Sequence, residues 1–283
     1  MSDPNLAIER LTRTVTEQLA ALPEVVAIAL GGSRAVGRAD PESDIDLYIY
    51  TRADVPLLAR HSMVQACGGA SRADIGMTFW GPDDEWIDLE SGIEVDLIYF
   101  GALWMEQQID QVLAQHRASL GYTTCLWHTM RNHKSLHDPT AWLSTLQSRC
   151  QEGYPEPLRR NIVAMNHPVL TNVIPSYATQ LQKAVERRDL VSINHRLAGF
   201  LASYFDILFA LNRVPHPGEK RLVQCAQELC TQLPSNMAED ISLLLEHCPT
   251  KPQAMLADVA RVAHRLDELL AAEGFDPGTS HTR

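Results

Sequence analysis

Residues 31–50 read GGSRAVGRADPESDIDLYIY. The glycine pair follows the apolar run 25–30, and this order predicts a buried strand and then a turn whose backbone N–H groups can hold phosphate. Four acids follow in the same stretch, namely Asp40, Glu42, Asp44 and Asp46. Carboxylates repel phosphate, so the turn and the acids can serve one ligand only if a cation lies between them.

The second half of the stretch predicts where that cation binds. Residues 45–50 favour a strand, and side chains alternate across a strand, so Asp44 and Asp46 share one face. Two neighbouring carboxylates suit Mg²⁺, which proteins hold with one or two carboxylates plus substrate phosphates. The phosphate-binding loop of the P-loop enzymes does not fit, because Arg38 and Ala39 stand where Lys and Ser or Thr are required. The pattern therefore predicts a metal–triphosphate site of another kind.

A third acid comes from a later predicted strand. In GIEVDLIYF, residues 92–100, Glu94 and Asp96 alternate with the apolar Val95 and Leu97. An unpaired carboxylate among buried apolar residues is costly, and a metal ion is a good partner for it. Either Glu94 or Asp96 can act as the general base, and both remain open at this point.

Taken together, Gly32-Ser33, the Asp44/Asp46 pair and Asp96 resemble the nucleotidyltransferase superfamily of DNA polymerase β. That family has a Gly-Ser turn, then an Asp-x-Asp pair, and a third carboxylate on a later strand. Within it, the chain is most similar to the bacterial small-molecule nucleotidyltransferases, such as those that adenylylate aminoglycosides and lincosamides. Segment 135–147 resembles a segment just after the catalytic domain in that group, and segment 204–222 resembles a helical-domain segment of uncharacterised bacterial members; neither identifies a substrate.

The resemblance implies a role for each site residue. Asp44 and Asp46 would coordinate two Mg²⁺ ions, and Asp96 would bind the second ion or act as general base. Gly32, Ser33 and Arg34 would contact the phosphates. The reaction would be attack by an acceptor hydroxyl on the α-phosphate of an NTP, most simply ATP, with release of pyrophosphate. Because the first lysine of the chain is Lys134, we expect the ammonium contact to come from the helical region, with Lys220 and Arg221 as candidates.

Two other functions compete with this one. One is a nucleotide-binding regulator that has lost turnover, which the intact set of three carboxylates argues against. The other is a nucleotidyltransferase of the toxin–antitoxin type that modifies a protein side chain or an RNA end. Those enzymes are usually shorter and lack a long helical domain.

The element pattern predicts an α+β protein in two parts. We expect a small mixed-sheet nucleotidyltransferase domain over residues 1–100 and an all-α helical-bundle domain over 101–283. The first part contains predicted helices at 3–22 and 56–66, strands at 25–30, 45–50 and 74–80, and a hairpin of 85–90 with 93–100. After Phe100 the apolar spacing becomes helical, as in Leu256, Val259, Ala263, Leu266 and Leu270.

The charge and composition of the chain limit the classes of partner that we expect it to bind. The 283 residues carry a net charge of −11; residues 1–100 hold 7 Arg, no Lys and 17 acids, a net −10. This disfavours nucleic acid as a partner and suits a metal ion or a cationic small-molecule acceptor. Six scattered cysteines without a C-x-x-C pair, and no signal or membrane-spanning segment, predict a cytoplasmic protein with reduced thiols. The sequence does not indicate an oligomeric state.

Some polar residues carry weaker expectations. His133 and His137 have a zinc-chelating spacing but no third ligand, so we expect them to face solvent. Asp88 is expected on the wet face of the hairpin. The roles of His195, His216 and Tyr204 stay open.

Overall fold

The computed structural model describes residues 4–37, 39 and 43–276. The chain forms two compact units. The first contains the residues up to Asp110 together with 129–152, and the second contains 111–128 together with the residues from Gly153 onward. Helices α4 (Ala102–Leu113) and α5 (Cys125–Asn132) each pass from one unit to the other. A third crossing follows after Glu152, so the chain passes between the units three times, whereas the sequence suggested one change of character near residue 100.

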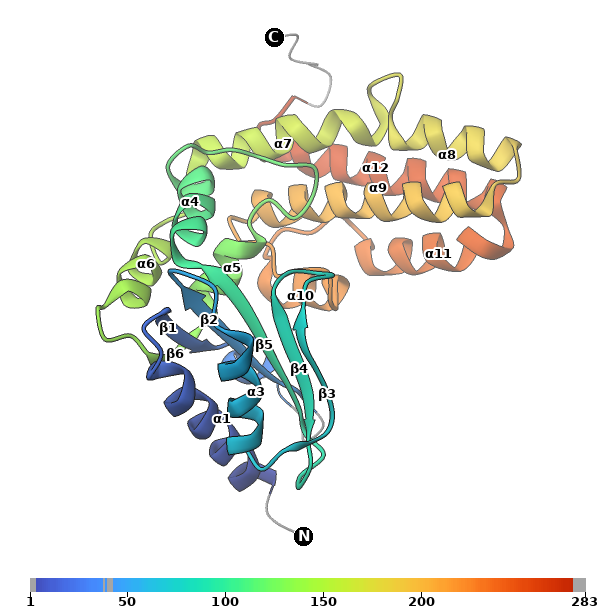
Figure 1. Ribbon diagram of the computed structural model, residues 1–283. Helices are drawn as coiled ribbons and strands as arrows, with labels where there is room; N and C mark the ends of the chain where they lie inside the picture. The colour runs from blue at the N-terminus through green and yellow to red at the C-terminus, as the bar shows by residue number, and fades with distance from the viewer. Residues whose placement is uncertain (1–3, 38, 40–42, 277–283) are drawn as a thin grey trace. The chain divides into compact units, whose positions relative to one another are not determined.

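The first unit is built on a six-stranded mixed sheet with the order β3-β4-β5-β2-β1-β6 (Figure 1). Only β2 and β5 run parallel; the other four pairings are antiparallel. The strands are β1 (Val25–Leu30), β2 (Ile45–Thr51), β3 (Ala70–Met77), β4 (Asp83–Asp88), β5 (Glu94–Gly101) and β6 (Lys134–His137). This sheet, with the helices that follow it, confirms the predicted α+β class.

Two helices, α1 (Pro4–Ala20) and α3 (Leu57–Ala66), cover one face of the sheet (Figure 1). The core between them and the sheet is apolar: Leu11, Val15 and Leu19 of α1 pack with Ile28, Ile45, Leu47, Val95 and Leu97 of the strands. Because side chains alternate along a strand, the residues between these point to the opposite face. That opposite face carries Asp46 and Asp96. The unit also contains the single turn α2 (Gly32–Ala35) and the helix α6 (Trp142–Cys150).

Two details of the sheet differ from the sequence expectation. The strand predicted over 74–80 ends at Met77, because the chain turns through Gly81, which has φ +152°, into Pro82, which has no N–H to donate. In addition, the expectation that strands stop after Phe100 was wrong, since β6 pairs with β1 at Leu30↔Lys134 and Ala29↔Ser135. The hairpin of β4 and β5 around Ser91-Gly92 is confirmed.

The second unit is helical. Its helices are α7 (Glu156–Thr171), α8 (Tyr177–Glu186), α9 (Leu190–Leu211), α10 (Leu222–Leu229), α11 (Met237–Thr250) and α12 (Pro252–Ala272), with parts of α4 and α5. The central helix is α9, where every residue from Ser203 to Leu211 is buried. A helix that is buried all round must be covered by neighbours, here α7, α8, α11 and α12. Among the described residues, no helix is both long and apolar enough to cross a bilayer.

Candidate functional site

The glycine turn lies directly against Asp46. The N–H of Gly31 donates to the carbonyl oxygen of Asp46 at 2.9 Å. Gly32 has φ +58°, in the left-handed region, and a Cβ at that residue would lie 1.8 Å from Oδ2 of Asp46. Only glycine meets both conditions, because any side chain there would displace the carboxylate. The glycine turn and Asp46 are thus held together as one structural unit.

The parallel pairing of β2 with β5 brings two of the predicted acids, Asp46 and Asp96, side by side. Asp46 is the direct register partner of Asp96, and both side chains are partly buried. Their strand neighbours Ile45, Leu47, Val95 and Leu97 are fully buried on the opposite face. Burial of those four apolar residues fixes the register, since a slip of one residue would turn them toward the acids' face. Asp44 immediately precedes β2 and is also partly buried.

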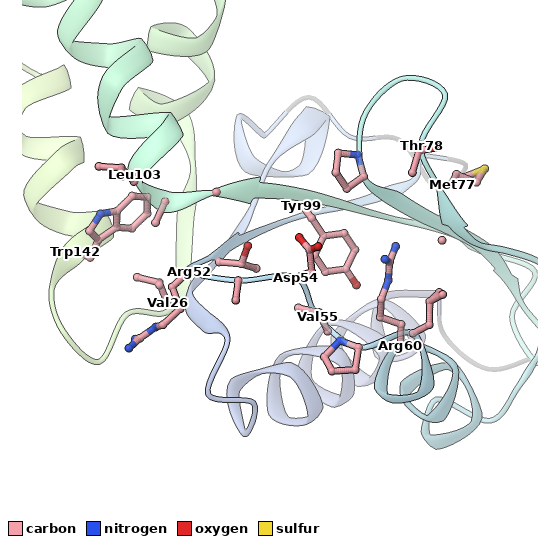
Figure 2. Close-up of a pocket in the computed structure, with 18 of the residues that line it drawn as sticks. Val26, Arg52, Asp54, Val55, Arg60, Met77, Thr78, Tyr99, Leu103 and Trp142 are labelled. Carbon is pink, nitrogen blue, oxygen red and sulfur yellow. The ribbon is translucent and has the colours of Figure 1, made fainter.

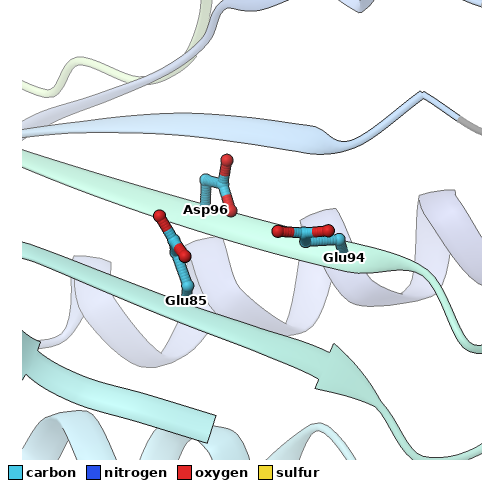
Figure 3. A group of neighbouring side chains, drawn as sticks. All are labelled: Glu85, Glu94 and Asp96. Carbon is cyan, nitrogen blue, oxygen red and sulfur yellow. The ribbon is translucent and has the colours of Figure 1, made fainter. Parts of the chain in front are cut away.

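A further acid, Glu85, was not anticipated from the sequence. β4 runs antiparallel to β5, and Glu85 is the register partner of Asp96. Figure 3 shows Glu85 and Asp96 on neighbouring strands with Glu94 beside them, and a carboxylate oxygen of each lies within 4.8 Å of the other two. Asp46, Asp96 and Glu85 therefore form a row across three adjacent strands. Alternation of residues along a strand predicts the face on which a side chain lies but not the residue opposite it on the next strand. Glu85 therefore could not be identified as a site residue from the sequence.

Crowding of carboxylates perturbs the central acid. Burial raises the pKa of Asp96 to about 7, and the negative charges of Glu85, Asp46, Glu94 and Asp44 add to the rise. Its Oδ1 is buried and has no hydrogen-bond partner among the described residues. A buried carboxylate oxygen facing other carboxylates is stabilised when a cation is placed beside it.

These residues fit Mg²⁺. The ligand atoms are all carboxylate oxygens, which hard divalent cations prefer. The Oδ1 of Asp96 has no hydrogen-bond partner among the described residues, and Gly32 lies close to Asp46. The carboxylates therefore lie beside the turn, where phosphate oxygens would complete the coordination shell of a bound ion. Asp44, Asp46 and Asp96 would hold the metal.

The predicted phosphate contacts differ in their surroundings. Arg34 donates from Nε to the carbonyl oxygen of Asp44 at 2.9 Å and from Nη2 to that of Ser43. Its guanidinium therefore ties the glycine turn to the start of β2. Ser33 is partly buried in α2. Arg38, Asp40 and Glu42 lie outside the described residues.

Lys220 and Arg221 lie in the second compact unit, just before α10. Both are exposed, and Arg221 has φ +55°. The predicted position near a helix start is confirmed. Their contact with phosphate stays a prediction, because the glycine turn belongs to the other unit.

His133 corrects an expectation. It was expected to face solvent, yet its residue surface is only 7% exposed. Its Nδ1 lies 2.9 Å from the hydroxyl oxygen of Tyr50, and its ring centroid lies 4.3 Å from that of Tyr48. Burial lowers the pKa of His133 to about 3, so the ring is neutral. Its Nε2 lies 3.2 Å from where a Cβ of Gly31 would be, so the ring packs against the start of the turn.

Asp88 was also placed wrongly by the sequence. It is buried, and it accepts hydrogen bonds from Arg10 at 3.2 Å and from the hydroxyl of Ser91 at 2.6 Å. The hairpin turn at Ser91-Gly92 folds back over it, which turns an apparent surface acid into a structural one.

The polar residues of uncertain role belong to the second unit. Tyr204 and His216 are buried there, and His195 is exposed. The backbone N–H of His216 donates to Oγ1 of Thr124 at 2.7 Å. Burial lowers the pKa of the His216 imidazole to about 4. Tyr204 stacks on Phe200 in the helical core. Burial of this kind favours a structural role for both residues.

Two cavities lie in the first unit. A cavity of about 280 Å³ adjoins the acids and is lined by Trp80, Gly81, Pro82, Asp83, Glu85, Asp96, Ile98, Tyr99 and Phe100. A larger cleft of about 1030 Å³ lies near the ends of β2 and β5, where Tyr99 and Arg60 face it (Figure 2). The larger cleft contains neither the glycine turn nor the row of acids. The smaller cavity is therefore the better candidate for part of the functional site, because Glu85 and Asp96 line it.

Comparison with known proteins assigns this domain. Residues 12–118 match the family described as nucleotidyltransferase domain, and residues 123–222 match a domain of unknown function (DUF4037). The first match spans the glycine turn and the acids, so the chain carries a nucleotidyltransferase domain. No curated protein matches the chain significantly.

Two solved structures show weak similarity to this chain. A nucleotidyltransferase-like protein from Exiguobacterium sibiricum 255-15 is 12% identical with a TM-score of 0.43, and the match covers 94% of this chain and 75% of that one. An aminoglycoside 6-adenyltransferase from Bacillus subtilis is 10% identical with a TM-score of 0.29, covering 93% and 91%. At these TM-scores neither likeness carries an argument about substrate.

Proposed function

We propose that this chain, whose residues 12–118 form a nucleotidyltransferase domain, transfers a nucleoside monophosphate from an NTP, AMP from ATP in the first instance, to a hydroxyl of a small-molecule acceptor and releases pyrophosphate. One observation carries the proposal: the register of β2 and β5 puts Asp46 beside Asp96 while Gly32 lies against Asp46. A phosphate-holding turn and a carboxylate pair are thereby joined at one point.

Asp44 and Asp46 would hold Mg²⁺, and Asp96 would either complete the metal site or act as general base. Bound Mg²⁺ would neutralise the phosphates and polarise the phosphorus–oxygen bonds. The protein's own contribution is positioning. The Gly31–Ser33 turn holds the phosphates on the β1 side of Asp46, and the row of acids continues on the other side toward β4.

The acceptor's proton goes to a carboxylate on the β5 side. Asp96 is the first candidate, since its carboxyl is crowded by Glu85 and Glu94 and one of its oxygens lacks a partner among the described residues. Glu94 is the second, because it shares the face and lies within the same group. A base must lie within hydrogen-bond reach of the attacking hydroxyl. The base and the turn lie on opposite sides of Asp46, as attack opposite a leaving pyrophosphate requires.

The smaller cavity supports a cationic acceptor. It adjoins Asp96 on the side away from the glycine turn, and Asp83, Glu85 and Asp96 line it without a Lys, Arg or His among its described lining residues. Trp80, at the turn between β3 and β4, is 94% exposed and forms one wall. Carboxylates beside an aromatic wall suit an amine-bearing compound that also has an apolar surface.

The function is tested by pyrophosphate release from each NTP with hydroxyl acceptors of two kinds, aminoglycosides and neutral sugars of similar size. We expect release with ATP and an amine-bearing acceptor, and a loss of at least about a hundredfold in Asp96→Asn. Glu90→Gln removes a charge from an exposed residue of the same hairpin and should keep wild-type activity. Absence of turnover with every NTP and acceptor, together with retained ATP binding, would favour the regulator instead.

Trp80 gives the acceptor site a test of its own. Trp80→Ala should raise the KM for the acceptor about tenfold, because an aromatic wall against a cation is worth roughly 1–2 kcal/mol, and should leave the KM for ATP unchanged. Phe79 is an adjacent aromatic that is also largely exposed and does not line the cavity. Phe79→Ala is therefore the control, and equal effects of the two substitutions would remove the cavity from the proposal.

A further inference from the structure

We propose that Lys134, the first residue of β6, binds the phosphate oxygens of the nucleotide at the Gly32–Ser33 turn. The inference rests on the proposed function and adds a residue to it. It replaces the expectation that the ammonium comes from Lys220 or Arg221.

Strand pairing brings Lys134 to the turn from 100 residues away in the chain. β6 runs antiparallel to β1, and Lys134 is the register partner of Leu30, the residue just before the glycine pair. The Nζ of Lys134 donates to the carbonyl oxygen of Arg34 at 3.2 Å. The ammonium therefore lies on the backbone of the turn itself.

That ammonium is available to a ligand. Lys134 is exposed, and an ammonium has three N–H donors, of which this contact uses one. No carboxylate in the described part of the chain forms an ion pair with it. Its charge is therefore not already neutralised by one of the described acids of this unit.

Arg34, another described cation beside the turn, already has hydrogen-bond partners in the loop. Arg34 directs Nε and Nη2 at the carbonyl oxygens of Asp44 and Ser43. These bonds hold the ends of the loop together, and turning the guanidinium toward phosphate would break them. Lys134 has no such structural duty, because its single bond to a turn carbonyl can be exchanged or shared.

The backbone that carries Lys134 is firmly placed. His133, its neighbour, is buried between the rings of Tyr48 and Tyr50 and bonded to the Tyr50 hydroxyl at 2.9 Å. The base of the lysine side chain is thus fixed, and only its flexible end must move. A preplaced cation loses less entropy on binding phosphate.

Charge explains why such a cation is needed. The five carboxylates of Asp44, Asp46, Glu85, Glu94 and Asp96 repel a triphosphate. Metal ions at those acids neutralise the phosphates nearest to them. Phosphate oxygens over the turn lie on the β1 side, where Lys134 is the described cation with N–H donors left for them.

The test is calorimetric titration of Mg²⁺·ATP and of Mg²⁺·tripolyphosphate into the full chain. Lys134→Ala should weaken both ligands by a similar factor, about ten- to a hundredfold for a lost charge-assisted hydrogen bond. Tripolyphosphate has no base or sugar, so an equal loss locates the contact on phosphate. Lys134→Arg should restore most of the affinity. Because the side chain is exposed, the unfolding temperature of Lys134→Ala should equal that of the wild type.

Controls separate contact from net charge. Arg131→Ala removes one positive charge from the same unit, where the Arg131 side chain donates to exposed Gln151 and has no bond to the turn among the described contacts. It should bind tripolyphosphate within about twofold of wild type. An equal loss in Arg131→Ala and Lys134→Ala, or wild-type binding by Lys134→Ala, overturns the inference.

Failure of the proposed function gives a different result. If the wild type binds Mg²⁺·ATP and Asp44→Asn/Asp46→Asn does not, the metal–phosphate site stands and Lys134→Ala decides the inference alone. If the wild type binds neither ligand, the site and Lys134's role in it both fail.

Discussion

Gly32 is the residue on which the site depends most, and it is constrained twice. Gly32→Ala should lower Mg²⁺·ATP affinity more than tenfold, because the Cβ would lie 1.8 Å from Oδ2 of Asp46, and should cost about 1–2 kcal/mol from the left-handed φ alone. Gly37, with φ +72° and nothing within 4 Å of its Cβ position, is the matched control. Gly37→Ala should show the loss of stability without the loss of affinity, measured by calorimetry and thermal unfolding. Equal affinities would contradict the close approach.

His133 makes stability depend on pH in a known direction. Its pKa is about 3 in the folded chain and near 6.5 when unfolded. Between these values only the unfolded state takes up the proton, so stability is full above about pH 6.5 and is lost as the pH falls, by at most about 1.4 kcal/mol per unit. His133→Asn lacks this component. Urea unfolding at pH 7.5, 6.0 and 5.0 should show its deficit relative to wild type shrinking toward acid pH; a constant deficit would show that His133 does not titrate this way.

At the scale of elements, a buried ion pair ties α3 to β4. Arg60 of α3 donates from Nε to Oδ2 of Asp84 at 2.7 Å. Asp84 also accepts from the N–H of Gly76 and the hydroxyl of Tyr99, each at 2.8 Å. Asp84 directly precedes Glu85, so this cluster fixes the strand that supplies the unanticipated acid.

Breaking that pair should be costly. Arg60→Met leaves a fully buried carboxylate without its cation and should lower the free energy of unfolding by about 3–5 kcal/mol. The double variant Arg60→Met/Asp84→Asn removes the charge as well and should recover part of the loss. Denaturant unfolding of both singles and the double gives the coupling between them. Additive losses would show that the two side chains do not interact.

How far the sequence predicts these elements depends on what each one requires. Strand β1 is a short continuous apolar run and strands β2 and β5 alternate, so all three and the faces of Asp46 and Asp96 could be located. The short β6 has no alternation, because its residues Lys134, Ser135 and Leu136 are exposed. Its place comes only from pairing with β1. Cross-strand partners such as Glu85 and Asp96 depend on turn geometry, and burial of His133 depends on a tertiary contact, so neither is written in a local pattern.

At the scale of the whole molecule, the acid-rich first unit should respond to metal. Under the proposed function Mg²⁺ binds the folded acids and not the unfolded chain, so it should raise the unfolding temperature of the wild type in proportion to log concentration. Asp44→Asn/Asp46→Asn should be more stable than wild type without Mg²⁺, because repulsion is relieved, and should lose most of the response. Thermal unfolding in MgCl₂ at up to about 20 mM, compared with NaCl at the same ionic strength, separates specific binding of Mg²⁺ from screening of charges. Equal responses of the two proteins would place the metal elsewhere.

The late strand β6 has a consequence for what counts as a self-sufficient piece of this protein. The family match ends at residue 118, yet the sheet closes only when residues 134–137 cover β1. A fragment that stopped at the family boundary would keep the turn and all five carboxylates, but β1 would become an open edge, ready to pair with another chain. The region that matches the family is thus shorter than the region needed to keep β1 from pairing with another chain. Lys134 lies in the part that the family match leaves out.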